Sequence, residues 1–378
     1  MFGDDIGIPE SGNGAPDILD EIAVELRWLQ RMQEPSGAVL TKVGMTAHGH
    51  PNPPSSDTQA RYYEEVCSSS TIALASMFAH AAVVLGPVAQ HQQLADELQA
   101  QAIDAWNWFQ ANPLQEDCDP KVVLAGDADL SAEDQTAEAV VAAVYLYELT
   151  GDAEYRDAVT AGLASTRPFR DFDFGRYSPH HADALLHYRG LDRADPATVE
   201  AIDGRLAQVV QGDTYGFDPD QSLYRSSMPD GQYHWGSNRV LASTGVLNLI
   251  ADVDGSRERA LAHLHTFHGV NPLGLTYLTN TESIGAERSA QTLFHFWFGA
   301  GSDYDTTEGS AIGVPPGFVV GGPNRWYSGS LTPPANQPPM KSYLDDNWHD
   351  GEPLWELSEP AIYYQAGYIR LLASLLSE

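Results

Sequence analysis

The spacing of apolar residues limits the possible folds most, because helical periods fill most of residues 17–268. Near the start, Ile18, Leu19, Ile22 and Leu26 form a stripe that predicts a helix running from Pro16 to about residue 32. Further helices are predicted at residues 68–85, 92–110, 131–151, 152–163, 178–188, 195–210, 236–251 and 257–268. Strand signals are sparse, and no alternation of strands with helices appears. About ten helices in sequential pairs predict an all-α solenoid or a closed α/α toroid.

Two of these helices carry further signals. Residues 68–85 are almost continuously apolar, which is typical of a helix buried on all sides. Ser131 precedes Asp134 by three residues, a near match to a capping box, and Gly151 is suited to end the helix that follows. We therefore expect the first helix to lie in the core and the second to run from Ser131 to Gly151.

Few helices or strands are expected between residues 271 and 353. This segment is rich in glycine and proline, yet it also contains many aromatic residues, which argues against disorder. We predict that it forms one wall of a binding cleft inside a single domain, residues 1–378.

The stretch that follows combines indoles, tyrosines and carboxylates just before an apolar run at 368–376. Aromatic rings cover the apolar faces of sugars, and a carboxyl held among them can stay protonated. Glu359 is therefore a candidate proton donor. The alternative is that Pro360 starts the last helix and Glu359 only complements the positive end of that helix.

The chain is strongly acidic, with a formal net charge of −32 and only three lysines, Lys42, Lys121 and Lys341. Nucleic acid is excluded as a partner, because binding it relies on basic side chains that neutralise phosphates. The acids are scattered, which favours a surface adapted to high salt over one acidic interaction tail.

The chain has only two cysteines. Cys67 and Cys118 define neither a disulfide framework nor a zinc site, and whether they pair is left open. His48 and His50 lie on a loop without a nearby cysteine, so a metal site there is not expected. We find no run of about 18 apolar residues and no signal segment, and so expect no membrane partner.

Five motifs in order resemble glycoside hydrolase family 9, the inverting cellulases, over essentially the whole chain. They are IPESGNGAPDILDE at 8–21, YHWGSN at 233–238, GVNPLG at 269–274, PGFVVGGPN at 316–324 and KSYLD at 341–345. The resemblance implies an (α/α)6 barrel with an open cleft for a β-1,4-glucan. It also implies that Glu359 is the general acid and that Tyr364 lines the neighbouring sugar subsite. Substrate-binding roles follow by the same resemblance for His295, Trp297, Trp235, Asn238, Tyr343 and Asp345.

Two departures from the family pattern stand out. Many members have His-His-Arg where this chain has His295-Phe-Trp297, so stacking replaces a guanidinium, and His295 is alternatively a histidine packed among phenylalanines. The motif Asp-Ala-Gly-Asp that carries the family's base is absent from these residues, and we assign neither Asp4 nor Asp5 to that role. We expect the base motif upstream, together with a first barrel helix whose absence exposes an apolar seam.

The expected activity is hydrolysis of β-1,4-glucosidic bonds by an inverting two-carboxylate mechanism. The alternative is a catalytically incomplete homologue that binds carbohydrate. The resemblance implies an extracellular monomer that needs no cofactor, with structural calcium as an option. An oxygen-rich candidate site for calcium lies at Asp127, Asp129, Glu133 and Asp134, although such clusters also arise by chance at this acidity.

Overall fold

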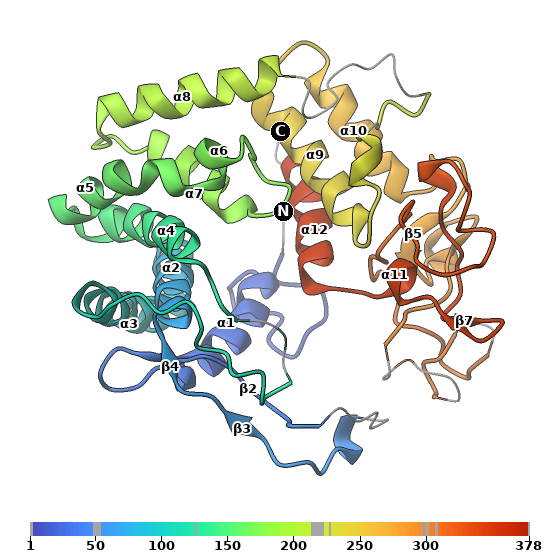
Figure 1. Cartoon of the computed structure of the whole chain (residues 1–378), viewed down its shortest axis with the longest axis horizontal. Coiled ribbons are helices and arrows are strands. Elements are labelled where there is room, and N and C mark those ends of the chain that lie inside the picture. Colours follow the sequence, from blue (N-terminus) through green and yellow to red (C-terminus); the bar gives the residue numbers. More distant parts are fainter. Residues whose placement is uncertain are drawn as a thin grey trace. The chain divides into compact units, whose positions relative to one another are not determined.

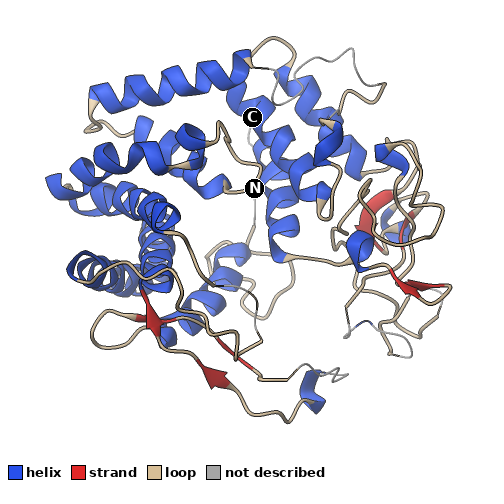
Figure 2. Ribbon diagram, in the orientation of Figure 1, coloured by secondary structure: helices blue, strands red, loops and turns tan. Residues whose placement is uncertain are grey.

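Contacts within the computed structural model group the chain into two compact units. The N-terminal unit contains Met1–His48, Gln59–Phe174 and Ser178–Leu206, and the C-terminal unit contains Gly49–Thr58, Gly175–Tyr177 and Ala207–Glu378. The structure describes residues 3–47, 54–124, 126, 128–212, 223–226, 228–295, 298, 302–306 and 309–376. Helices are the main regular elements of both units (Figures 1 and 2). The single domain expected from the sequence stays a prediction.

The N-terminal unit is built from helices that follow one another along the chain. Its helices are α1 (Asp17–Leu29), α2 (Ser68–Leu85), α3 (Gln92–Ala111), α4 (Ala132–Thr150), α5 (Ala153–Gly162), α6 (Arg167–Arg170) and α7 (Pro179–Arg189), and α8 (Pro196–Gln211) begins in it. Two antiparallel pairs join β1 (Val39–Leu40) to β4 (Val66–Cys67) and β2 (Val43–Gly44) to β3 (Tyr62–Tyr63). The helices predicted from the sequence are confirmed, while the four-residue α6 was not foreseen.

Helix ends follow the local chemistry of the sequence. The Ser131 side chain accepts a hydrogen bond from the Asp134 amide, and Gly151 ends α4 with a φ of 77°, a left-handed conformation that suits glycine. Pro16 is the residue before α1, and the carboxylates of Asp17 and Asp20 lie in the first turn. The capping signals therefore act as predicted.

The core of this unit surrounds α2, which packs against α3 and α4. Ile72, Leu74 and Phe78 of α2 are completely or almost completely buried, whereas Met77 and Val84, which share another face of the helix, are exposed. Contrary to the expectation from the sequence, α2 is long and apolar enough to cross a membrane by length and composition, but 61% of it is buried. Such burial is typical of a core helix in a globular domain.

An open apolar cavity of about 420 Å³ lies against α1, β1 and α2. The side chains of Trp28, Met32, Leu40, Leu74 and Met77 line it, and the indole of Trp28 is partly exposed. The apolar seam expected from the sequence stays a prediction.

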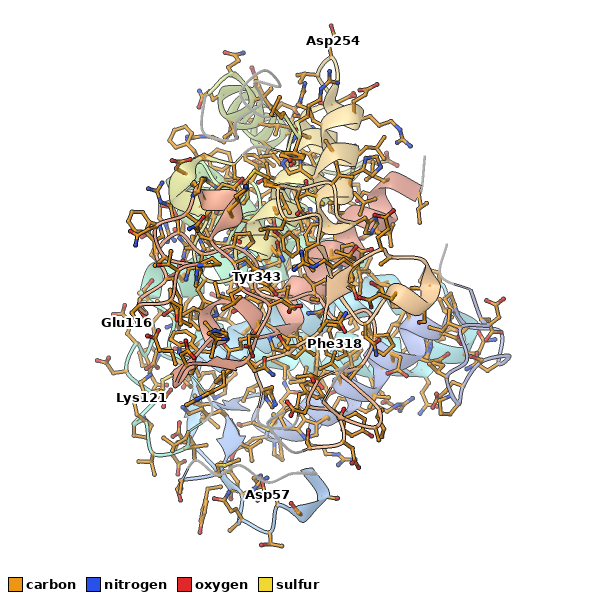
Figure 3. The ribbon with its side chains drawn as sticks, turned by 90° about the vertical axis from the view of Figure 1, so that its right-hand side faces the viewer. Asp57, Glu116, Lys121, Asp254, Phe318 and Tyr343 are labelled. Atoms are coloured by element: carbon orange, nitrogen blue, oxygen red, sulfur yellow. A yellow bond between two sulfur atoms is a disulfide. The ribbon has the colours of Figure 1, made fainter. Side chains whose placement is uncertain are left out.

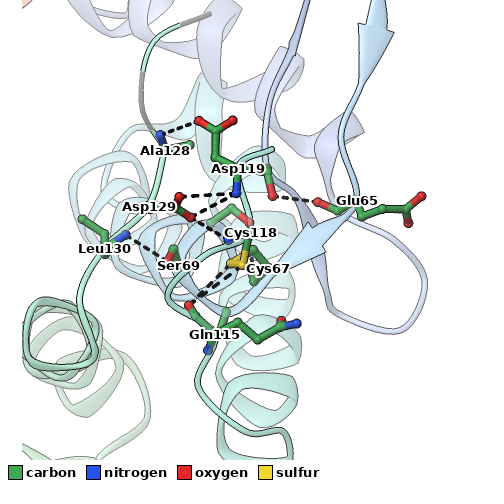
Figure 4. The surroundings of a disulfide bond; sticks show 12 residues. Glu65, Cys67, Ser69, Gln115, Cys118, Asp119, Ala128, Asp129 and Leu130 are labelled. Carbon is green, nitrogen blue, oxygen red and sulfur yellow. Dashed lines mark hydrogen bonds between the residues drawn. A yellow bond between two sulfur atoms is a disulfide. The ribbon is translucent and has the colours of Figure 1, made fainter. Parts of the chain in front are cut away.

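One disulfide joins Cys67, the residue before α2, to Cys118 in the loop between α3 and α4. Around it, the Asp129 carboxylate accepts hydrogen bonds from the amides of Cys118 and Asp119, and Ser69 accepts one from the Leu130 amide (Figure 4). The structure thus decides the pairing that the sequence left open. The pair closes a separation of 51 residues that contains α2 and α3, and it ties the loop after α3 to the start of α2.

The C-terminal unit consists of three packed helices and an irregular segment. Helix α9 (Ser237–Ala251) packs against α10 (Ser256–Phe267) and α12 (Ile362–Leu376), and the short α11 (Trp355–Ser358) precedes α12. The strands β5 (Thr276–Thr279) and β6 (Ser289–Ala290) are parallel, and β7 (Trp348–His349) and β8 (Glu352–Pro353) form an antiparallel pair. Helix α12 begins at Ile362, ahead of the apolar run from residue 368 that indicated it.

The described part of residues 271–353 is mostly irregular, as predicted, yet it contributes to the core. Tyr277, Val319, Val320 and Tyr343 are buried within one cluster that also includes side chains of α9 and α12. Phe318 and Tyr343 lie among densely packed side chains of this unit (Figure 3). Apolar burial therefore orders the segment together with only two short strand pairs, β5–β6 and β7–β8.

Candidate active site

The candidate acid, Glu359, lies immediately after α11 in the C-terminal unit. Its backbone is extended, with φ −64° and ψ 126°, and its amide donates to the Trp355 carbonyl at 3.1 Å. A residue before proline avoids the helical region, so Pro360 ends α11 at this position. The alternative based on the sequence put Pro360 at the start of the last helix, which begins two residues later, at Ile362. Whether Glu359 only complements the positive end of that helix stays untested.

The Trp235 indole contacts the Glu359 carboxyl, and the Trp355 indole packs against Trp235. The rings of Trp235 and Trp355 meet edge to face, with centroids 5.0 Å apart. Burial raises the pKa of Glu359, and a hydrogen bond from the Trp235 side chain partly opposes this rise. A raised pKa keeps a carboxyl protonated closer to neutral pH, which is what a general acid requires.

Close backbone contacts hold the segment before Glu359 in place. The Gly322 amide donates to the Leu357 carbonyl at 3.0 Å, and the Phe294 amide donates to the Ser358 carbonyl at 3.2 Å. A Cβ at Gly321 would lie 2.8 Å from the Leu357 carbonyl oxygen, so only glycine allows this approach. The glycines of the motif at 316–324 therefore position the candidate acid.

The motif at 233–238 packs against the same glycines. The almost fully buried side chain of Asn238 donates to the Val320 carbonyl at 2.9 Å. The backbone amide of Asn238 donates to the Gly321 carbonyl at 3.0 Å. This bonding explains how Trp235, three residues earlier, comes to lie beside Glu359. Direct contact between Asn238 and a substrate stays a prediction, and its burial favours a structural role.

Tyr364 lies next to the candidate acid but is only 2% exposed. A Cβ on Gly236, whose φ is 79°, would lie 2.4 Å from the Tyr364 hydroxyl oxygen. The neighbouring Tyr363 is 48% exposed. The guanidinium carbon of Arg239 lies 4.9 Å from the centroid of the Tyr363 ring. Sequence reasoning missed Tyr363 and Arg239, because exposure on a helix with two successive tyrosines depends on which face packs.

Of the two candidate substrate-binding residues His295 and Trp297, the structure describes only His295. Trp297 lies outside the described residues. The ring of His295 is 6.0 Å from that of Phe298, and burial lowers its pKa, so the neutral imidazole is favoured. The Phe294 amide donates to the carbonyl of Ser358, the residue before Glu359. His295 directly follows Phe294 in the chain. Its role in binding a sugar hydroxyl stays a prediction.

The motif at 341–345 supplies two further buried groups. Tyr343 is buried with its ring edge-on to Tyr277, which favours a packing role over substrate contact. The carboxyl of Asp345 accepts hydrogen bonds from the Gln291 amide at 2.8 Å and the Thr292 hydroxyl at 3.1 Å. Asp345 thus anchors the segment that leads to His295.

Burial raises the pKa of Asp345 to about 6, which makes a prediction about stability. Its pKa in the unfolded chain is about 3.9, so folding favours the protonated form, and the resulting stabilisation is lost as pH rises from about 4 to 7. The free energy of unfolding from denaturant titrations should therefore contain a component that falls by up to about 3 kcal/mol over this range. Asp345→Asn should remove that component; an unchanged pH dependence in this variant would contradict the assignment.

Among the described residues, two groups could supply metal ligands, and both lie in the N-terminal unit. In one group Asp129 lies near Cys67 and Cys118, which are joined in the disulfide and offer no thiolates. In the other, Glu138 lies beside His180 and His181. The Glu138 carboxylate is bonded by both imidazoles, at 3.2 Å from His181 Nε2, and these bonds lower its pKa against the effect of burial. The Arg167 amide donates to His181 Nδ1, so in neutral His181 the proton is on Nε2 and faces Glu138. This tautomer fits a hydrogen-bonded cluster and not a ligand to a metal ion.

The oxygen-rich segment proposed for calcium is engaged in other contacts. Asp134 and Glu133 pair with Arg170, at 2.8 and 3.3 Å, and Asp129 accepts backbone hydrogen bonds near the disulfide. Asp127 lies outside the described residues, as do His48 and His50. The described carboxylates of this segment therefore do not converge on one point.

Asp4 also has a structural role. Its carboxylate accepts hydrogen bonds from the amides of Gly12, Asn13 and Gly14, the shortest at 2.6 Å, and so holds the loop before α1. This bonding is consistent with not assigning Asp4 as the catalytic base.

Comparisons with known proteins agree with one another. The model of glycosyl hydrolase family 9 matches residues 6–372. Endoglucanase C of Cellulomonas fimi is 30% identical over 337 residues, which is 84% of this chain and 29% of that protein. A cellodextrinase of Butyrivibrio fibrisolvens is 25% identical over 97% of this chain and 66% of its own length.

Solved structures share the fold. A metagenome-derived glycoside hydrolase family 9 endoglucanase has a TM-score of 0.76 and 29% identity over 98% of this chain and 64% of its own. The fold class predicted from the sequence, all-α of the (α/α)6-barrel type, is thereby confirmed. The chain spans less than two thirds of that structure's chain and under a third of the length of endoglucanase C.

Proposed function

Because this chain belongs to glycosyl hydrolase family 9, we propose that it acts on β-1,4-glucosidic bonds of cellulose or a related β-glucan. The observation that carries the proposal is the half-buried Glu359 carboxyl held beside Trp235 and Trp355, with a raised pKa. Relatives named endoglucanase and cellodextrinase support the substrate class.

In this proposal Glu359 protonates the glycosidic oxygen as the bond to the departing sugar breaks. Trp235 lies against a sugar ring through its exposed face, and its N–H bonds the carboxyl. Exposed Tyr363 and the guanidinium of Arg239 extend the polar and aromatic lining next to α12. An inverting reaction also needs a carboxylate that activates water about 6.5–9.5 Å from the acid, and we assign no residue of this chain to that step.

The proposal extends to the setting of the reaction. The chemistry uses two carboxylates and water, so no cofactor is required, and a structural calcium ion stays a prediction. The disulfide between Cys67 and Cys118 supports an extracellular location, since disulfides persist in oxidising compartments. The net charge of −32 supports function at high salt, and the protein is proposed to act as a monomer.

Release of reducing ends tests the substrate class. At high salt, the protein should release reducing sugar from carboxymethyl-cellulose and bind cello-oligosaccharides, because both contain β-1,4-linked glucose. Starch, an α-1,4-glucan, is the matched control and should be neither bound nor cut. Equal activity on the two polymers would contradict the proposal.

The second candidate function is carbohydrate binding without turnover. Calorimetry that detects binding of cellohexaose, together with reducing-sugar release no higher than that of a heat-treated sample, would select this alternative.

A further inference from the structure

Three exposed indoles are carried by neighbouring loops of the C-terminal unit. The exposed fraction is 46% for Trp235, 60% for Trp326 and 59% for Trp348. Single exposed aromatic residues are common on protein surfaces, but several on adjoining loops are not. Trp326 follows the motif at 316–324 and has no part in the contacts described for the candidate acid.

The loop of Trp326 is joined to the elements that hold Glu359 and Trp235. The Arg325 amide donates to the Tyr233 carbonyl at 2.8 Å, and the Asn324 side chain donates to the buried Glu356 carboxylate of α11 at 2.8 Å. These bonds fix residues 324–326 against both α11, which ends at Glu359, and the loop of Trp235.

The same loop is joined to the hairpin of Trp348. The Tyr327 hydroxyl donates to the Glu352 carboxylate at 2.9 Å, and Glu352 belongs to β8, whose partner strand contains Trp348. The loops that carry the three indoles are therefore connected through direct hydrogen bonds.

The Trp326 indole has the Arg325 guanidinium over its ring and is otherwise largely exposed to solvent. The guanidinium carbon of Arg325 lies 4.8 Å from the ring centroid, and Arg325 is itself paired with Asp230 at 2.9 Å. The Trp326 amide donates to the Asn324 side chain at 2.9 Å. An indole covered on one side by an anchored cation loses little conformational freedom when a ligand contacts its open side.

We propose that Trp326 forms a further sugar-binding subsite, where its indole stacks on a pyranose ring of a bound β-glucan beyond the sugar that contacts Trp235. This inference rests on the proposed function, because it takes the ligand to be a β-glucan. The apolar C–H face of a pyranose matches an exposed indole, while its hydroxyl groups remain in water. The subsite adds affinity for long chains and leaves short ones unaffected.

Binding of oligosaccharides of two lengths tests the subsite. Calorimetry with cellobiose and cellohexaose should be done in a Glu359→Gln background, so that no turnover occurs. Trp326→Ala should weaken cellohexaose binding by about tenfold, as expected for truncating an aromatic anchor, and leave cellobiose binding unchanged. Trp28→Ala, which removes a partly exposed indole of the N-terminal unit, is the matched control and should change neither affinity.

A second variant separates stacking from folding. Arg325→Met keeps a long side chain but removes the cation, and it should weaken cellohexaose binding less than Trp326→Ala does. Equal cellohexaose affinities for Trp326→Ala and its parent, with the parent binding well, would overturn the subsite and leave the proposed function intact. A parent that binds neither oligosaccharide would overturn both. Weakening of both ligands to the same extent would assign Trp326 a structural role and also overturn the subsite.

Discussion

Glu359→Gln should lower the rate of carboxymethyl-cellulose hydrolysis by about 10²–10⁴-fold, because glutamine cannot donate a proton to the leaving oxygen. The loss should appear in kcat more than in KM, since the proton is transferred in the transition state. Reducing-sugar release by wild-type and variant proteins measures it. Asp254→Asn, which alters an exposed carboxyl of the same unit (Figure 3), is the control and should retain the wild-type rate.

The leaving group provides a sharper form of this test. A dinitrophenyl cellobioside releases a phenolate that needs no protonation, so Glu359→Gln should slow its cleavage far less than that of cellulose. Equal losses on both substrates would indicate damage to the site and not the loss of an acid. Unfolding is not expected to account for the loss, because burial already raises the Glu359 pKa and therefore opposes its ionised form.

The pH profile of the wild-type protein should reflect the same group. A general acid is active only when protonated, so the rate falls as pH rises through the Glu359 pKa. Since burial raises this pKa, the fall should come at a higher pH than for an ordinary glutamate. A rate that keeps rising across that range would remove Glu359 from the role of proton donor.

Removal of the disulfide should produce the largest change in stability. The bond between Cys67 and Cys118 closes a separation of 51 residues, and the loop-entropy relation gives a contribution of about 4 kcal/mol to the free energy of unfolding. A Cys67→Ala, Cys118→Ser double variant should lose a comparable amount in denaturant titrations. Alanine is chosen at position 67 because Cys67 is fully buried and a hydroxyl there would need a partner.

Reductant supplies the control for this prediction. Dithiothreitol should destabilise the wild-type protein to the level of the double variant and leave the double variant itself unchanged. Thiol titration of the unreduced, denatured wild-type protein should find no free cysteine. An identical free energy of unfolding with and without the bond would show that the loop around Cys118 is restrained by other contacts, such as those of Asp129.

Much of the helical framework could be predicted from the sequence because its causes are local. Ser131 and Gly151 define the ends of α4 through bonds within one turn, and continuous apolarity made α2 a core helix. The last helix, α12, begins at Ile362, close to Pro360, where the sequence offered a start, although Tyr363 and Tyr364 are weaker helix formers than the leucines that follow. Packing of the helix against α9 outweighs that weakness.

For the candidate site too, some features follow from the sequence and others only from the tertiary structure. By itself, the sequence determined the helical class and the order of the motifs, because patterns of neighbouring residues carry that information. The choice of Glu359 came from the resemblance to the family, and its role stays a prediction. Only the tertiary structure decided that Trp235 lies beside Trp355 and Glu359, that Tyr363 is exposed while Tyr364 is buried, and that Cys67 pairs with Cys118. These contacts join distant segments, and whether they form depends on which faces pack together, a property that no local pattern contains.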